Sequence, residues 1–198
     1  MKRKIKDLKK VSEENLTLKI VKESIRILII SSILVTIGGI ALKYIEDRLV
    51  VLIPLLILIP ALNKMLGDFG IIIVSKFTTM LYARKVRKPL LHSHNLRHLF
   101  KDVFPIAILS AIYVSVLATL IAKFKGFPFD FIFLAKVLAI TLSITIVFIF
   151  LHFLIAVVGG LYVYRKGLDP DDVLIPITTS IADLGGMLLL TFFVVWLF

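Results

Sequence analysis

Two aspartates, Asp68 and Asp183, lie inside stretches of the sequence that are otherwise strongly apolar. A carboxylate near the centre of a membrane-spanning helix costs about 2.5–3.5 kcal/mol on insertion scales, so it is expected to face protein, water or a cation. Asp183 comes ten residues after Val173, or about 15 Å along a helix, which is close to the bilayer midplane. The two acids therefore predict a cation site within the membrane.

The residue types around these aspartates indicate which kind of cation would bind. Carboxylate, hydroxyl and carbonyl oxygens suit hard cations such as magnesium, calcium or manganese, and the sequence has no cysteine to supply a thiolate. Magnesium releases its waters reluctantly, so one or two carboxylates are enough to hold a hydrated ion. A two-fold dimer would bring two copies of Asp183 to one axis, where a divalent cation would offset their repulsion.

The two aspartates belong to segments of similar pattern. Residues 59–70 read IPALNKMLGDFG, and residues 175–186 read IPITTSIADLGG. In each, Ile-Pro is followed seven or eight residues later by Asp, then by an apolar residue and Gly. Discontinuous helices of this kind expose carbonyls to ions in many transporters, so the pattern predicts two helix breaks at one site. The alternative is a pair of packing kinks without function.

Five apolar stretches are predicted to position these residues. The fold class is all-α, that of a polytopic integral membrane protein, because 59% of the residues are hydrophobic and the mean hydropathy is +1.01. The second stretch is too long for one simple crossing, so a broken or strongly tilted helix is expected there, with two short crossings as the alternative. The predicted spans are residues 25–45, 49–83, 103–122, 131–157 (extending to 164) and 173–198.

The distribution of Lys and Arg predicts the orientation in the bilayer. With the N-terminus inside, 18 basic residues fall in cytoplasmic segments and four in outside loops. This bias predicts a multi-pass protein of the cell membrane whose N-terminus is cytoplasmic and whose C-terminus is outside. Residues 1–24 form a cytoplasmic basic arm, and residues 25–198 form the transmembrane domain. The net charge of +11 comes from the basic residues of these cytoplasmic segments. No nucleic-acid partner is therefore expected.

Several other polar residues have simpler interpretations. His92, His94 and His98 have the composition of a metal cluster, but their basic loop favours contact with lipid headgroups. His152 is alone in the fourth span and predicts a packed or hydrogen-bonded histidine. The sequence has no phosphate-binding glycine loop, no HExxH and no nucleophile elbow, so no enzymatic activity is expected.

Charged residues near the ends of the predicted spans are interpreted as helix-end contacts. Asp169, Asp171 and Asp172 precede the last span and are expected to cap the N-terminus of its helix, although they could also attract cations at the inner mouth. Lys136, near the outer end of the fourth span, is expected to snorkel to the interface.

These motifs resemble the membrane domain of MgtE-type magnesium transporters and of the related solute carrier family 41. The matching residues on the second span are Pro60-Ala61-Leu62-Asn63, Gly67-Asp68-Phe69-Gly70 and Ser75-Lys76-Phe77-Thr78-Thr79. Those around the fifth span are Asp169-Pro170, Pro176, Ile177-Thr178-Thr179-Ser180, Asp183 and Gly186. The resemblance covers nearly the whole chain and includes the number of spans and their orientation.

The resemblance implies a homodimer of five-helix subunits, with a central ion pathway between the second and fifth helices and Mg²⁺ as the transported ion. Asp183 matches the family's magnesium-binding acid. The expected metal ligands are Asp183, Asp68 and Thr179. The residues expected to line the pore are Asn63, Gly67, Gly70, Ser180 and Gly186. The alternative function is a non-transporting membrane scaffold or assembly protein in which the intramembrane Asp has a structural role.

The sequence departs from the family's pattern in three respects. Asp68 stands where the family has Asn, which adds negative charge to the pathway. Lys64 precedes Asp68 by four residues and is expected to pair with it, or to act as a tethered cation. The cytoplasmic N-domain and cystathionine-synthase-like pair of bacterial members have no counterpart in the sequence. We therefore expect transport without their magnesium-sensing gate.

Overall fold

A computed structural model describes residues 25, 28–84, 94–128 and 130–198. All regular structure in these residues is helical, which confirms the all-α fold. Four helices are long and apolar enough to cross a membrane, and a first helix, Leu28–Tyr44, is shorter. The labelled helices are α2 (Glu46–Val51), α3 (Ile53–Tyr82), α4 (His94–Phe124), α5 (Phe131–Arg165) and α6 (Pro170–Leu197). Four of the five predicted spans are thus of spanning length, and the predicted basic arm lies outside the described residues.

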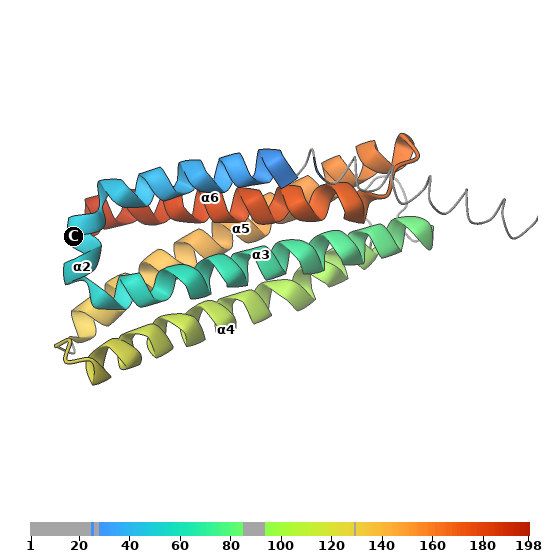
Figure 1. Cartoon of the computed structure of the whole chain (residues 1–198). Helices are drawn as coiled ribbons and strands as arrows, with labels where there is room; N and C mark the ends of the chain where they lie inside the picture. Colours follow the sequence, from blue (N-terminus) through green and yellow to red (C-terminus); the bar gives the residue numbers. More distant parts are fainter. Residues whose placement is uncertain (1–24, 26–27, 85–93, 129) are drawn as a thin grey trace, which may run out of the picture.

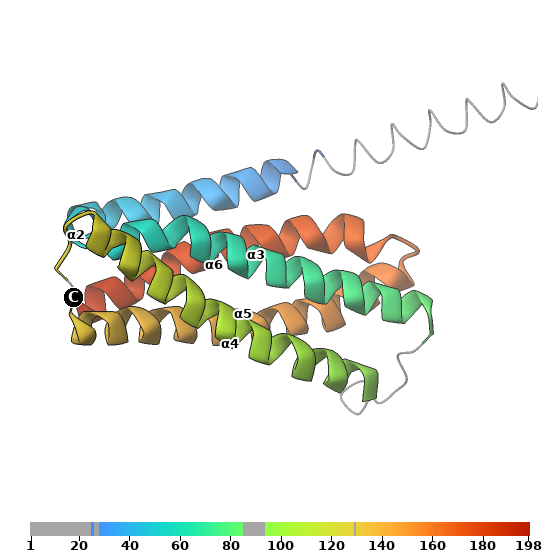
Figure 2. The ribbon, with the colours of Figure 1, turned by 90° about the horizontal axis from the view of Figure 1, so that it is seen from below.

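The helices lie lengthwise beside one another (Figure 1). We call Leu28–Tyr44 the N-terminal helix; it runs along α6 in the same direction. The hydroxyl of Ser31 donates to the carbonyl of Pro176 at 3.4 Å, and the hydroxyl of Thr191 donates to the carbonyl of Ala41 at 3.2 Å. Figure 2 places this helix at one edge of the bundle, with α4 and α5 on the opposite side. A parallel arrangement of the first and last helices is what an odd number of alternating crossings would give.

Helix α3 lies at the centre of the bundle and packs against α4, α5 and α6. Small residues allow these close approaches. A Cβ atom added to Gly160 of α5 would lie 2.9 Å from the ring of Phe77 of α3, and one added to Gly70 of α3 would lie 3.0–3.3 Å from the ring of His152 of α5. These two glycines thus allow α3 and α5 to pack closely against each other.

The predicted breaks at the two Ile-Pro motifs are absent. Helix α3 continues through Pro60, and α6 continues through Pro176. A proline removes one backbone N–H from the hydrogen bonds of a helix. A membrane helix can continue through it, because neighbouring polar groups satisfy the carbonyl that is left free. In α6, the hydroxyls of Thr178, Thr179 and Ser180 donate to carbonyls of the preceding turn. The second predicted stretch is instead interrupted earlier, where α2 ends at Val51 and α3 begins at Ile53.

The two ends of α6 are held by charged side chains. Asp169 caps the N-terminus, because its carboxylate accepts a hydrogen bond from the backbone N–H of Asp171 at 3.0 Å. At the C-terminus, Lys136 of α5 donates to the carbonyl of Leu197 at 2.9 Å, and Arg48 of α2 donates to the carbonyls of Val194 and Val195 at 3.4 Å. Cations at the carbonyls of the last turn stabilise the end of the helix. Lys136, predicted to snorkel, therefore joins α5 to α6.

Candidate ion pathway between α3 and α6

The two intramembrane acids lie at the middles of their helices. Asp68 is the 16th of the 30 residues of α3, and Asp183 is the 14th of the 28 residues of α6. The two helices are antiparallel, because Asn63 faces Gly186 whereas Ser75 bonds Asp171 at the other end. If these helices span a bilayer, both carboxylates lie near its midplane, where water is scarce.

A glycine on each helix makes the contact between α3 and α6 close. A Cβ atom on Gly186 would lie 2.7 Å from Oδ1 of Asn63, and one on Gly67 would lie 3.8 Å from the Cγ2 methyl of Thr179. Four of the predicted site residues thus meet in two pairs across one interface. Asp183 follows Thr179 by four residues and precedes Gly186 by three. Helical spacing therefore places it on the same side of α6 as these two residues, which contact α3. Its carboxylate belongs to the turn of α6 that crosses α3.

Asp183 is half-buried and has no hydrogen-bond or ion-pair partner among the described residues. Its immediate neighbours in the sequence, Ala182 and Leu184, are apolar, and the nearby hydroxyls of Thr179 and Ser180 donate to carbonyls of α6. A buried charge without a partner is costly, so such a group is retained where a ligand, water or another subunit supplies the partner. Asp183 is therefore the carboxylate of this interface whose partner lies outside the described residues.

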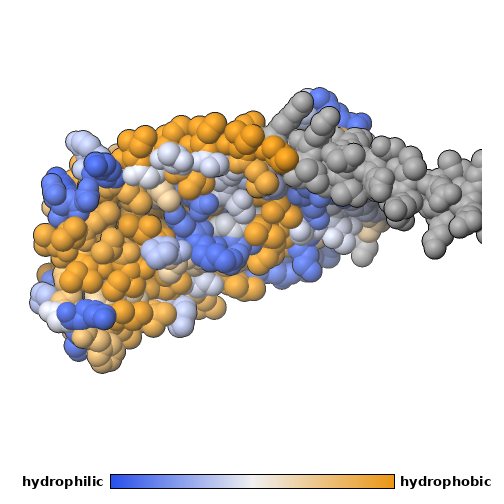
Figure 3. All heavy atoms as spheres, in the orientation of Figure 1, coloured by the Kyte–Doolittle hydropathy of each residue, from blue (hydrophilic) through white to orange (hydrophobic). Residues whose placement is uncertain are grey.

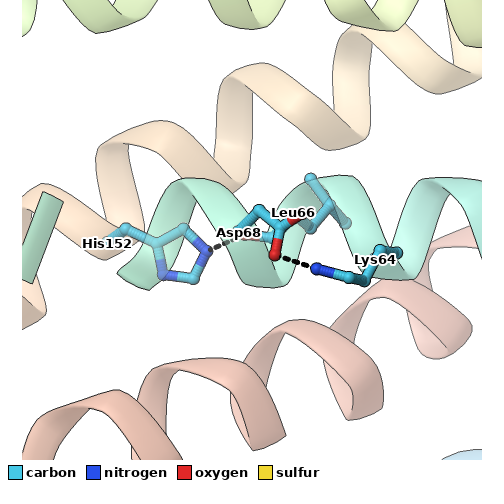
Figure 4. Close-up of polar contacts among 4 residues, drawn as sticks. All are labelled: Lys64, Leu66, Asp68 and His152. Carbon is cyan, nitrogen blue, oxygen red and sulfur yellow. Dashed lines mark hydrogen bonds and ion pairs between the residues drawn. The ribbon is translucent and has the colours of Figure 1, made fainter. Parts of the chain in front are cut away.

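Asp68 differs from Asp183, because Lys64 forms an ion pair with it one turn earlier on α3 (Figure 4). This is the i,i+4 pair expected from the sequence. The pair lies at the surface of the chain, with 74% of the Lys64 side chain and 46% of the Asp68 side chain exposed. The space-filling view in Figure 3 likewise shows hydrophilic residues midway along the molecule, between apolar regions. The surface of a single chain thus carries a charged patch near the middle of α3, a helix long enough to span a bilayer.

The hydroxyls near Asp183 are oriented by their own helix. Thr179 donates to the carbonyls of Ile175 and Pro176 at 3.0 Å, and Ser180 donates to the carbonyl of Pro176 at 2.6 Å. Each donated proton leaves the lone pairs of the hydroxyl oxygen directed elsewhere, and those lone pairs are what a hard cation or its waters would use.

Gly70 and His152 form a different contact, between α3 and α5. Gly70, predicted to line the pore, has the ring of His152 as its nearest neighbour and faces α5. The ring is fully buried, and its Nε2 atom lies 3.1 Å from the carbonyl oxygen of Leu66 (Figure 4). His152 is thus packed and hydrogen-bonded, as expected. Its position against the turn of Asp68 was not apparent from the sequence, which places the two residues 84 positions apart.

No group of three or more His, Cys, Asp or Glu side chains converges as a metal site within the part of the chain that the structure describes. A divalent cation at Asp183 would therefore need water, hydroxyl or carbonyl oxygens, or a second copy of the chain, to complete its coordination. This agrees with the chemistry of magnesium, which commonly keeps several waters.

A family model described as a divalent cation transporter, MgtE, matches residues 59–193, which is more than half of the chain. The chain belongs to the MgtE family. The match extends from the first Ile-Pro motif to the last turns of α6 and includes every candidate site residue. No curated protein and no solved structure matches the chain significantly.

Membership of the MgtE family establishes the broad class of the protein. MgtE proteins are divalent cation transporters, a class distinct from enzymes. Together with four helices of spanning length, the family identifies a multi-pass membrane protein whose surroundings are the lipid bilayer and divalent cations.

Proposed function

We propose that this MgtE protein transports Mg²⁺ through a symmetric homodimer, along a pathway between α3 and α6. One observation carries the proposal: Asp183 lies at the centre of α6, half-buried and without a partner among the described residues. An acid at this depth is stabilised by a cation, and a doubly charged one interacts with it twice as strongly at a given distance. The expected ligands are Asp183, Asp68 and the hydroxyl of Thr179.

A dimer explains the charged patch that a single chain exposes. Lys64 and Asp68 lie at the middle of α3 with much of their surface uncovered. Contact with lipid tails would be costly for both, so a partner subunit or a water-lined passage is expected to cover them. A two-fold axis near α6 would place two Asp183 carboxylates around one hydrated ion, and the ion would offset their mutual repulsion.

Within this pathway, Lys64 is proposed to act as a tethered cation. Its ammonium group neutralises Asp68 when no ion is present. An arriving divalent cation competes with it for the same carboxylate, and the flexible lysine side chain can withdraw toward water. The extra acid at Asp68 therefore adds attraction for a cation without leaving an unpaired charge in the empty pathway.

The energy for transport would come from the ion gradient and the membrane potential, which contributes about 2.3 kcal/mol per charge per 100 mV. With the N-terminus in the cytoplasm and the C-terminus outside, as the distribution of Lys and Arg predicts, the N-terminus of α6 faces the cytoplasm. Asp169, Asp171 and Asp172 would then lie at the inner mouth of the pathway.

The described contacts give little support to a purely structural role for these charges. A scaffold in which Lys64 and Asp183 join helices would need ion pairs between helices. Lys64 instead pairs with a residue of its own helix, and Asp183 contacts no cation among the described residues.

Uptake of Mg²⁺ into proteoliposomes tests the proposal. Asp183→Asn keeps the shape of the side chain and removes its charge, so uptake should be abolished while the protein remains a dimer. Asp47→Asn makes the same change on α2, outside the pathway, and should leave uptake unchanged. Unchanged uptake by Asp183→Asn would refute the site assignment, and folded monomers of the unmodified protein would refute the dimer.

A further inference from the structure

The first turns of α4 carry a second pair of polar side chains, on a helix other than the two that border the proposed pathway. His94 and His98 are four residues apart, so they lie one above the other on the same face of the helix. Their Nε2 atoms are 3.2 Å apart, and both residues are exposed. The basic loop predicted from the sequence therefore contains the start of a helix, and the helix brings two of its histidines together.

This separation fits two ligands of one metal ion. Zinc–imidazole distances of about 2.0–2.1 Å place cis nitrogen ligands roughly 2.9–3.4 Å apart, depending on whether the geometry is octahedral or tetrahedral. The two rings are tilted by 59° with centroids 4.3 Å apart, so the nitrogens converge without the rings stacking face to face. In the absence of metal, one neutral imidazole can donate its Nε2–H to the other, and a metal would replace that proton.

The surroundings leave room for further ligands. His98 lines a cavity of about 290 Å³ between α3 and α4, together with Asp102 one turn further along α4 and Lys76 of α3. The lining thus contains one carboxylate and one ammonium group, whose charges offset each other. Because no third His, Cys, Asp or Glu converges with the pair among the described residues, water would occupy the remaining coordination positions.

We propose that His94 and His98 form a two-histidine site for a borderline transition-metal cation such as Zn²⁺, Ni²⁺ or Co²⁺. Imidazole nitrogens suit these ions, whereas Mg²⁺ and Ca²⁺ prefer oxygen. The site would thus select a different class of metal from the oxygen-lined pathway. It lies at the end of the bundle that the charge distribution places in the cytoplasm, and it does not depend on the proposed transport function.

Calorimetric titration of the purified, untagged chain with Ni²⁺ tests the site. One Ni²⁺ should bind per chain, and either His94→Ala or His98→Ala should weaken binding by about tenfold or more. Arg97→Ala, on the same helix turn, should bind Ni²⁺ like the unmodified chain. The proposal would be overturned if the unmodified chain did not detectably bind Ni²⁺, or if both histidine variants bound it as tightly as the unmodified chain.

Two further titrations separate this site from the pathway. A large excess of Mg²⁺ should leave the affinity for Ni²⁺ unchanged, because nitrogen ligands discriminate against Mg²⁺. Asp183→Asn should also bind Ni²⁺ normally, even if the same variant has lost Mg²⁺ uptake. Competition by Mg²⁺, or loss of Ni²⁺ binding in Asp183→Asn, would assign the bound metal to the pathway and overturn the histidine site.

Discussion

The ammonium group of Lys64 bonds the carboxylate of Asp68 one turn further along α3, near the middle of a helix of 30 residues. On α6, Asp183 lies at a similar depth and has no such partner among the described residues. The same type of side chain thus occurs in two states in one chain: one acid carries its own counter-ion, and the other has none among the described residues. Under the proposed function, the transported cation occupies that second position.

Lys64→Met is expected to increase the apparent affinity for Mg²⁺. The substitution removes the ammonium that competes for Asp68 while preserving an unbranched apolar chain. The half-saturating Mg²⁺ concentration for uptake should fall about two- to fivefold, which corresponds to the modest energy of an exposed ion pair. Lys125→Met, at the turn after α4, provides the matched control. An unchanged or higher half-saturating concentration would show that Lys64 does not compete with the ion.

Gly186→Ala is expected to displace the side chain of Asn63 from its place between α3 and α6. The added methyl group would lie 2.7 Å from Oδ1 of Asn63, which is closer than packed atoms allow. Overpacking of this kind costs about 1–3 kcal/mol, measurable as a lower thermal midpoint in detergent. The double variant Asn63→Ala/Gly186→Ala removes the clashing amide and should recover much of that loss. If the double variant is as unstable as the sum of the single changes, the two residues are not in contact.

His152→Ala is expected to destabilise the bundle by about 2–4 kcal/mol, because it leaves a cavity against Gly70 and removes a hydrogen bond to the carbonyl of Leu66. His152→Phe fills the cavity but cannot donate, so it should lose less than half as much. Chemical denaturation of both variants gives the comparison. Equal losses would mean that the hydrogen bond, and not packing, is the main contribution of His152.

The absence of cysteine from the sequence allows a direct test of the proposed dimer axis. Asp183→Cys should cross-link two chains with a short bifunctional thiol reagent, since the axis brings the two positions together. Leu188→Cys is the control, because this exposed residue lies about 140° away around α6. Efficient cross-linking at Leu188 and none at Asp183 would place the axis on another face of α6.

Much of the fold could be predicted from hydrophobicity alone. Long apolar runs gave the positions of α5 and α6 within a few residues, because a bilayer requires helices of a minimum length. The start of α4 at His94 was missed, since its first turns are polar and basic and resemble a loop. The predicted breaks at Pro60 and Pro176 were wrong, because one missing donor is too small a loss to end a helix that is packed on several sides.

The residues of the candidate site could be predicted from the sequence more easily than the directions in which they face. Asp183 stands out because a charge in an apolar helix is costly wherever it points, and the Lys64–Asp68 pair follows from helical spacing. The direction of Gly70 toward α5 depends on how α5 packs, which no local pattern encodes. The close approach of His94 and His98 required knowing that they lie on a helix.

Mg²⁺-dependent thermal stability of the purified protein tests most directly whether Asp183 binds the ion. A ligand bound only by the folded state stabilises it by about 2.7 kcal/mol at a concentration 100 times its dissociation constant. The unfolding midpoint of the unmodified protein should therefore rise with Mg²⁺ concentration, and that of Asp183→Asn should stay constant. An equal rise in Asp183→Asn would contradict the central claim, because the stabilising ion would then be bound elsewhere.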